Sequence, residues 1–243
     1  MKVFTGCISD KGNCRAKNQD RAVCHIKRQK KSVLAVACVC DGIGSFEQSE
    51  IAAEMMTEGI TRWFRGIEEY YPVSMGREAL LEDLEITIRE LNELVYEYRL
   101  RNGIEIGCTM TVMLLVEDSF HIFHVGDSRV YCVRDAFYQI TRDEVTMGEA
   151  HGKVKPRLAN YIGRAKELWV NKLSGTVEEE EIYLLGSDGL FKHLAYEDVR
   201  TLGGWIKNDK RAQKACESML ELVLERGERD NVSCILLCIA STG

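Results

Sequence analysis

Several strand-like apolar segments of this sequence end or begin at an aspartate, and most of these aspartates stand beside glycine or another turn-forming residue. They are Asp20, Asp41, Asp143, Asp188 and Asp230. Asp41 and Asp188 each follow a long apolar run and precede a glycine, which lets another atom approach the backbone. If the strands that carry them are neighbours, the carboxylates meet at one edge of the core, where they repel one another unless a hard cation neutralises them. Since neither His nor Cys accompanies them, the ligand set favours Mg²⁺ or Mn²⁺ over Zn²⁺.

Each aspartate taken alone has a simpler explanation, because Asp-Gly and Asp-Asn are common in turns and Asp caps helices well. The set as a whole is what favours a metal site. Arg15 adds a second element, since it lies five residues before Asp20 in GNCRAKNQD. Such an arginine forms either an ordinary ion pair or a fork that holds a phosphate over the metals. Two divalent ions and an arginine are what phosphoester hydrolysis requires, because the ions activate a water and neutralise the developing charge.

The composition is that of an ordinary globular protein. The chain has 243 residues, of which 45% are hydrophobic and 29% charged, and its net charge of -6 argues against a partner made of nucleic acid. No apolar stretch approaches the ~20 residues of a membrane span, and the N-terminus MKVFTGCISD lacks the apolar core of a secretion signal. We therefore expect a cytoplasmic protein without a membrane partner.

The ten cysteines are scattered, with no CxxC pair and no spacing typical of zinc ligands. Most lie inside apolar runs, where a reduced thiol acts as a small hydrophobic group. Only Cys7 and Cys14 are expected near the acidic site.

Apolar, β-branched runs recur along the chain and predict strands. They are Val3–Ser9, Ala22–Ile26, Val33–Cys40, Thr109–Val116, Phe120–Val125, Val130–Val133, Ile182–Ser187 and Val232–Ile239. Helical spacing of apolar residues predicts helices over Glu47–Arg65, Arg77–Arg99 and Asp209–Arg226, with a short one near Tyr196–Leu202. The first two should pack as an antiparallel pair because the break between them is short.

This order of elements predicts an α+β fold. Short turns between neighbouring strands favour antiparallel pairing, and no βαβ alternation supports a doubly wound parallel sheet. We expect a β-sandwich of two mainly antiparallel sheets flanked by helix pairs, in four layers α-β-β-α. Residues 1–243 are expected to form a single domain, with an irregular flap near 142–180.

The order of the motifs resembles that of the metal-dependent serine/threonine protein phosphatases of type 2C, in their compact bacterial form. The resemblance covers nearly the whole chain. It rests on five segments in the family's order: SDKGNCRAKNQDR, VCDGIGSFEQSEIAA, GCTMTVMLL with FHVGDSRVYCVRDAFYQITRDE, LLGSDGLFKHL and GERDNVSCILL. The family fold is a β-sandwich flanked by helix pairs, in agreement with the expectation from the strand and helix patterns.

The resemblance also implies roles for particular residues. Arg15 would bind phosphate, and Asp41 would bridge two ions. Asp41, Asp188 and Asp230 would hold one ion, and Asp41, the Gly42 carbonyl and water-mediated contacts from Asp20 would hold the other. A third ion, found in bacterial members, would lie between Asp143 and Asp188.

Three residues depart from the family pattern. Gln19 stands where many members have Glu, Ile43 stands where eukaryotic members carry a histidine thought to act as general acid, and Cys108 replaces Thr. Asp127 in VGDSR is expected to brace a hairpin, and His124 is expected to pack within a strand.

We therefore expect an enzyme that hydrolyses phosphoserine and phosphothreonine in proteins by direct attack of a metal-activated water, using two or three Mn²⁺ or Mg²⁺ ions. Its partners would be phosphorylated proteins that are substrates of a serine/threonine kinase. Two alternatives remain open at this stage: a catalytically weak regulator that binds phosphoproteins, and a phosphatase of small phosphoesters.

Overall fold

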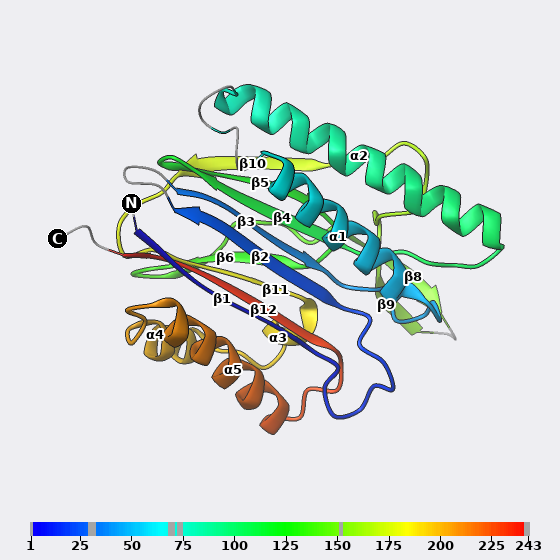
Figure 1. Ribbon diagram of the computed structural model, residues 1–243. Helices are drawn as coiled ribbons and strands as arrows, with labels where there is room; N and C mark the ends of the chain where they lie inside the picture. Colours follow the sequence, from blue (N-terminus) through cyan, green and yellow to red (C-terminus); the bar gives the residue numbers. More distant parts are fainter. Residues whose placement is uncertain (1, 29–32, 68–70, 72–74, 151–152, 241–243) are drawn as a thin grey trace.

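Two five-stranded antiparallel sheets face each other in the computed structural model, which describes residues 2–28, 33–67, 71, 75–150 and 153–240 (Figure 1). The first sheet has the order β1-β12-β11-β6-β7, formed by Lys2–Asp10, Val232–Ala240, Ile182–Gly186, Arg129–Val133 and Phe137–Gln139. The second has the order β10-β5-β4-β3-β2, formed by Asn171–Thr176, Ser119–Val125, Met110–Val116, Val33–Cys40 and Arg21–Arg28. Every pairing within these two sheets is antiparallel.

The strand β3 shows why the sequence has uninterrupted apolar runs. Alternate residues such as Val36 and Cys38 face the helices, whereas Ala35 and Ala37 face the opposite sheet. Side chains of a strand alternate between its two faces, so a strand that is buried on both faces needs apolar residues throughout. All eight residues of β3 are buried.

Helices cover the outer face of each sheet. The antiparallel pair α1 (Ser49–Ile67) and α2 (Arg77–Asn102) packs on the second sheet, and α3 (Asp188–Phe191), α4 (Tyr196–Gly203) and α5 (Asp209–Glu225) lie on the first (Figure 1). The amphipathic pattern of α1 places Met56, Ile60 and Phe64 against the sheet, where burial of apolar area stabilises the layer. The predicted four-layer α+β sandwich is thereby confirmed.

The segment 142–180 differs from the expectation of an irregular flap. It contains an antiparallel hairpin, β8 (Val145–Ala150) with β9 (Lys153–Leu158), and also β10, which pairs with β5 at the edge of the second sheet. The hairpin stands at one end of the sandwich as a separate two-stranded sheet (Figure 1). Because β10 is half exposed and the hairpin lies outside the main core, these strands contain charged and turn-forming residues. Their sequences therefore lack the apolar pattern that predicts a strand.

Within the residues described, no helix is long and apolar enough to cross a membrane.

Candidate active site

Five aspartates from separate parts of the chain approach one another at the end of the sandwich, because strands of both sheets begin or end there. Asp41 follows β3, Asp127 lies between β5 and β6, Asp188 opens α3 just after β11, and Asp230 precedes β12. These four line one polar pocket of about 150 Å³, and Asp20 lies buried beside it. The pocket is also lined by Arg15, Gly42, Ile43, Gly44, Thr109 and Leu158.

The backbone around Asp41 is held by the neighbouring strand. The Asp41 N–H donates to Thr109 Oγ1 at 2.9 Å, and the Thr109 N–H donates to the Asp41 carbonyl at 2.8 Å. The Ile43 N–H donates to the Gly107 carbonyl at 3.0 Å, so none of these three bonds uses the Gly42 carbonyl. A side chain at Gly42 would place its Cβ 2.6 Å from the Gln19 carbonyl oxygen, which explains the glycine. The Gly42 carbonyl thus remains available as an oxygen ligand beside Asp41.

Asp20 lies beside Asp41 rather than in the pocket. It is 1% exposed and accepts a hydrogen bond from Ser233 Oγ at 2.9 Å. Burial raises the pKa of Asp20 to about 6, although hydrogen bonds from Ser187, Ser233 and Asp41 oppose the shift. Asp20 therefore lies close to Asp41, and the water-mediated contact with a metal that the resemblance implies stays a prediction.

Asp41 itself lies mainly among other carboxylates, and Arg15 is a cation that lines the same pocket. Burial raises the pKa of Asp41 well above the ordinary value, and the carboxylates of Asp20, Asp188, Asp127 and Asp230 raise it further, in that order. A buried carboxylate among other carboxylates is stable in its charged form only with a cation beside it. The donor set, made of carboxylate and carbonyl oxygens, fits a hard divalent ion.

Two basic side chains hold the outer aspartates. Arg15 Nη2 lies 2.8 Å from Asp230 Oδ2, and Lys192 Nζ lies 2.7 Å from Asp188 Oδ2 and 4.0 Å from Asp230 Oδ2. With these partners in place, no three Asp, Glu, His or Cys side chains of the described chain already form a cage for an ion. The phosphate-binding arginine expected from the sequence therefore lies at the pocket, paired with a carboxylate.

Asp143 lies elsewhere than the sequence suggested. It forms a bidentate ion pair with Arg129, with Nε–Oδ1 at 2.9 Å and Nη2–Oδ2 at 2.6 Å, and it accepts a bond from Gln139 Nε2 at 3.0 Å. It is not among the residues that line the pocket. Its carboxylate is committed to Arg129, and the expected helix-cap or turn-cap alternative does not describe this pairing either.

Asp127 lines the pocket, although it is not among the candidate site residues that the sequence predicts. We expected it only to brace a hairpin. Burial raises its pKa to about 6, with further contributions from Asp188 and Asp143. The sequence did contain a sign of this position. Asp127 follows strand β5 and a glycine, and the other aspartates of the pocket also stand at strand ends.

Gln19 and the two cysteines Cys14 and Cys7 have different surroundings. Gln19 donates from Nε2 to the Phe46 carbonyl at 2.8 Å, so its amide supports the loop after Asp41. Cys14 is exposed beside Arg15, and all ten cysteines are free. Cys7 lies within β1, and burial raises the pKa of its thiol far above the ordinary value.

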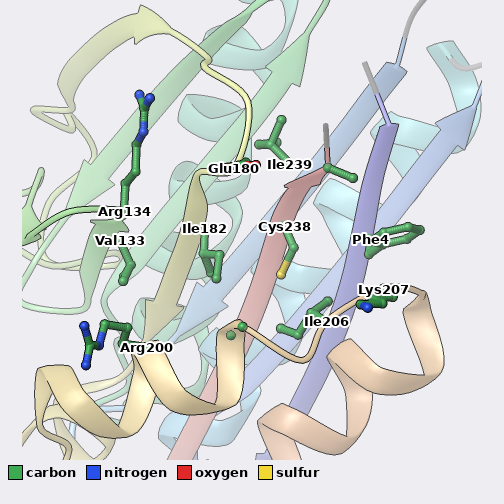
Figure 2. Close-up of a pocket in the computed structure, with 13 residues that line it drawn as sticks. Phe4, Val133, Arg134, Glu180, Ile182, Arg200, Ile206, Lys207, Cys238 and Ile239 are labelled. Atoms are coloured by element: carbon green, nitrogen blue, oxygen red, sulfur yellow. The ribbon is translucent and has the colours of Figure 1, made fainter. Parts of the chain in front are cut away.

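A larger hollow of about 510 Å³ lies at the other end of β11 (Figure 2). Ile182, at the first position of that strand, points into it together with Cys238 and Ile206, and Arg200 and Lys207 stand at its margin (Figure 2). Its walls are mainly apolar and contain no cluster of carboxylates. The chemistry therefore belongs to the smaller pocket.

Known proteins share this sequence and fold. Residues 13–202 match the profile of the family described as Protein phosphatase 2C. The protein phosphatase PhpP of Streptococcus pneumoniae is 23% identical over 244 residues, which cover 95% of each chain. The solved structure of the serine/threonine phosphatase Stp1 from Staphylococcus aureus is 22% identical, with a TM-score of 0.80, covering 99% of this chain and 96% of that one.

A further solved structure, the catalytic domain of the serine/threonine protein phosphatase PstP in complex with two manganese ions, has a TM-score of 0.73 and 22% identity, covering 98% of this chain and 99% of that one. A sandwich that gathers carboxylates at one end defines, together with the matching profile, a metal-dependent protein serine/threonine phosphatase. The chain belongs to the protein phosphatase 2C family.

Proposed function

We propose that the pocket around Asp41 removes phosphate from phosphoserine and phosphothreonine side chains of proteins. The observation that carries the proposal is the half-buried Asp41, which faces three further carboxylates at a pocket whose rim bears Arg15. Such a pocket concentrates negative charge that only cations balance, and the arginine at its rim offers two parallel N–H donors to a phosphate.

The residues of the chain divide into ligands and binding groups. Asp41, Asp188 and Asp230 would hold one divalent ion, and Asp41 with the Gly42 carbonyl would hold a second. Asp127 and Asp188 would hold a third ion, in the role that the resemblance gives to Asp143 and Asp188. When bound, Mn²⁺ or Mg²⁺ ions supply Lewis-acid charge and lower the pKa of water. Asp20, which is buried beside Asp41, would help to hold the Asp41 carboxyl in place.

Arg15 binds and orients the phosphate. In the structure its guanidinium pairs with Asp230, and the Arg15 side chain is 43% exposed, so a substrate can reach it. With Asp230 serving as a metal ligand, the Arg15 guanidinium would be free to bind the phosphate oxygens. The Ile43 side chain has no proton to donate. The proton for the leaving serine or threonine oxygen therefore comes from water or from another group.

The substrates are phosphoproteins, and we propose that a serine/threonine kinase phosphorylates them. We further propose that residues 1–243 form one domain and that the protein works in the cytoplasm. The free state of all ten cysteines suits a reducing compartment.

The test is phosphate release from a phosphothreonine peptide by the purified chain with Mn²⁺, with Mg²⁺, and with excess EDTA. We expect turnover with either ion and none in EDTA. Hydrolysis of p-nitrophenyl phosphate but of no phosphopeptide would instead support a phosphatase of small phosphoesters. Tight binding of the phosphopeptide without release would support the regulator.

A further inference from the structure

Lys192 occupies the position of a counter-cation at the acidic pocket. It directly follows α3, four residues after Asp188, and its Nζ contacts Asp188 Oδ2 at 2.7 Å. The same nitrogen lies 4.0 Å from Asp230 Oδ2. One lysine therefore faces two of the three carboxylates that we assign to the first ion.

Glu228 lies near Lys192 and Asp230, and one of its two carboxylate oxygens has no hydrogen-bond partner among the described residues. Its Oε1 accepts hydrogen bonds from the N–H groups of Arg229 at 2.7 Å and Asp230 at 2.8 Å. Its Oε2 is buried and has no hydrogen-bond partner in the described structure, and the His193 Nε2 lies 3.7 Å away. The residue is only 5% exposed, so this oxygen has lost water without gaining a donor, which is costly for a carboxylate.

Lys192 and Glu228 face the same hollow. A second pocket, of about 410 Å³, adjoins the acidic one and is lined by Cys14, Arg15, Lys192, Glu228, Arg229 and Asp230. Since the Lys192 side chain is 46% exposed, it has room to turn within this hollow. Glu228, whose Oε2 is buried and unpaired, is thus the carboxylate besides Asp230 that lines this hollow together with Lys192.

We propose that Lys192 is a tethered cation that competes with the metal: it neutralises Asp188 and Asp230 while the site is free of metal, and it moves to Glu228 when an ion takes its place. The inference rests on the proposed metal centre. It explains the close Lys192–Asp188 contact, which is the position of the lysine without metal. It also explains the unpaired oxygen of Glu228, which is the partner of the lysine when an ion is bound.

The two positions have opposite effects. Without metal, Lys192 reduces the repulsion among the carboxylates and stabilises the fold. Toward the metal it acts as a competitor, because the ion must displace an ammonium group from its ligand. Lys192 therefore sets how much free metal the enzyme requires.

The experiment is calorimetric titration of the metal-free protein with Mn²⁺. For Lys192→Met we expect a dissociation constant for the tighter ion that is about tenfold lower than that of the wild type, equivalent to about 1.4 kcal/mol. Lys192→Arg keeps the charge and should stay within about threefold of the wild type. Lys17→Met removes a lysine that pairs with Glu50 instead of with a site aspartate, and it should also change the constant by less than about threefold.

Glu228→Gln tests the second position. The amide keeps an acceptor for the two backbone N–H groups but offers no charge to the displaced lysine. We expect it to weaken Mn²⁺ binding severalfold in the wild type and to have little effect in the Lys192→Met background. Equal effects in both backgrounds would overturn the movement onto Glu228.

Thermal unfolding provides a readout that does not involve activity. Lys192→Met should lower the midpoint in EDTA and leave it equal or higher with saturating Mn²⁺, whereas a merely structural lysine would lower both. An unchanged Mn²⁺ constant for Lys192→Met would overturn the inference while leaving the metal centre intact. A wild-type protein that binds no Mn²⁺ would instead overturn the proposed function.

Discussion

Asp41 shows how one residue joins the fold to the chemistry. Hydrogen bonds to Thr109 position its backbone, and other carboxylates surround its side chain. In the metal-free site the fold therefore holds Asp41 against electrostatic repulsion. The same residue is the ligand that we assign to both central ions. Its contributions to stability and to catalysis therefore have opposite signs.

Asp41→Asn should separate the two contributions. We expect kcat with Mn²⁺ to fall at least about a thousandfold, because the metals supply several kcal/mol of transition-state stabilisation and each tenfold is about 1.4 kcal/mol. In EDTA the unfolding midpoint should be unchanged or higher, since the amide removes a repelled charge. A variant that is inactive only because it is unfolded, or one with near wild-type kcat, would contradict the assignment.

Asp127 and Asp143 form a matched pair for a second test. Asp127→Ala should reduce turnover and the number of bound Mn²⁺ ions, because its carboxylate lines the pocket. Asp143→Ala should leave turnover at saturating Mn²⁺ within about threefold and lower the free energy of unfolding by about 1–3 kcal/mol, because Arg129 loses a bidentate partner. The opposite pattern in kinetics and in metal stoichiometry would restore Asp143 as the ligand.

At the scale of elements, the β8–β9 hairpin is attached to the site through Glu144. The carboxylate of Glu144 accepts hydrogen bonds from the Gly126 N–H at 2.9 Å, from Asn160 Nδ2 at 3.1 Å and from Asn171 Nδ2. These donors lie in the turn before Asp127, at the end of the hairpin and in β10. One side chain thus links the hairpin to the turn that carries a site aspartate.

Glu144→Gln should loosen this attachment. The amide has a single acceptor oxygen, and its NH₂ group faces other donors, so we expect a loss of about 1–3 kcal/mol. Hydrogen exchange should become faster in β8, in β9 and around Gly126, and remain unchanged in β12. Glu149→Gln, at an exposed position of the same hairpin, is the control and should change none of these rates.

At the scale of the whole molecule, the buried carboxylates make metal-free stability depend on pH. The folded pKa of Asp20 is raised to about 6, above its unfolded value near 3.9. A raised pKa means that the folded state binds the extra proton. Its contribution is therefore complete below about pH 4 and is lost as the pH rises through about 6.

In EDTA we expect the free energy of unfolding to fall by on the order of 3 kcal/mol between pH 4 and pH 7 from this carboxyl. Denaturant unfolding across that range measures it, and Asp20→Asn should flatten the decline. Asp118→Asn, which changes an exposed carboxylate, should leave the decline in place. Stability that rises steadily with pH in EDTA would show that Asp20 is charged in the fold.

The sequence determined the fold class and the central aspartates because both are recorded in local patterns. Apolar runs such as Val33–Cys40 predict strands that are buried on both faces, and helical spacing marks α1, α2 and α5. An aspartate at a strand end, next to glycine, is likewise a local feature. For this reason Asp41 and Asp188 were found together with the sandwich that positions them.

Tertiary structure alone placed Asp127 at the pocket and Asp143 against Arg129, and it alone brought Lys192 beside Asp230 and Glu228. Both placements depend on where a side chain points and which distant residue neutralises it. Arg129 is adjacent to the VGDS turn in sequence, yet its guanidinium reaches 14 residues along the chain to hold Asp143. Charge pairing between remote residues leaves no period and no spacing in a sequence, so only the assembled fold reveals it.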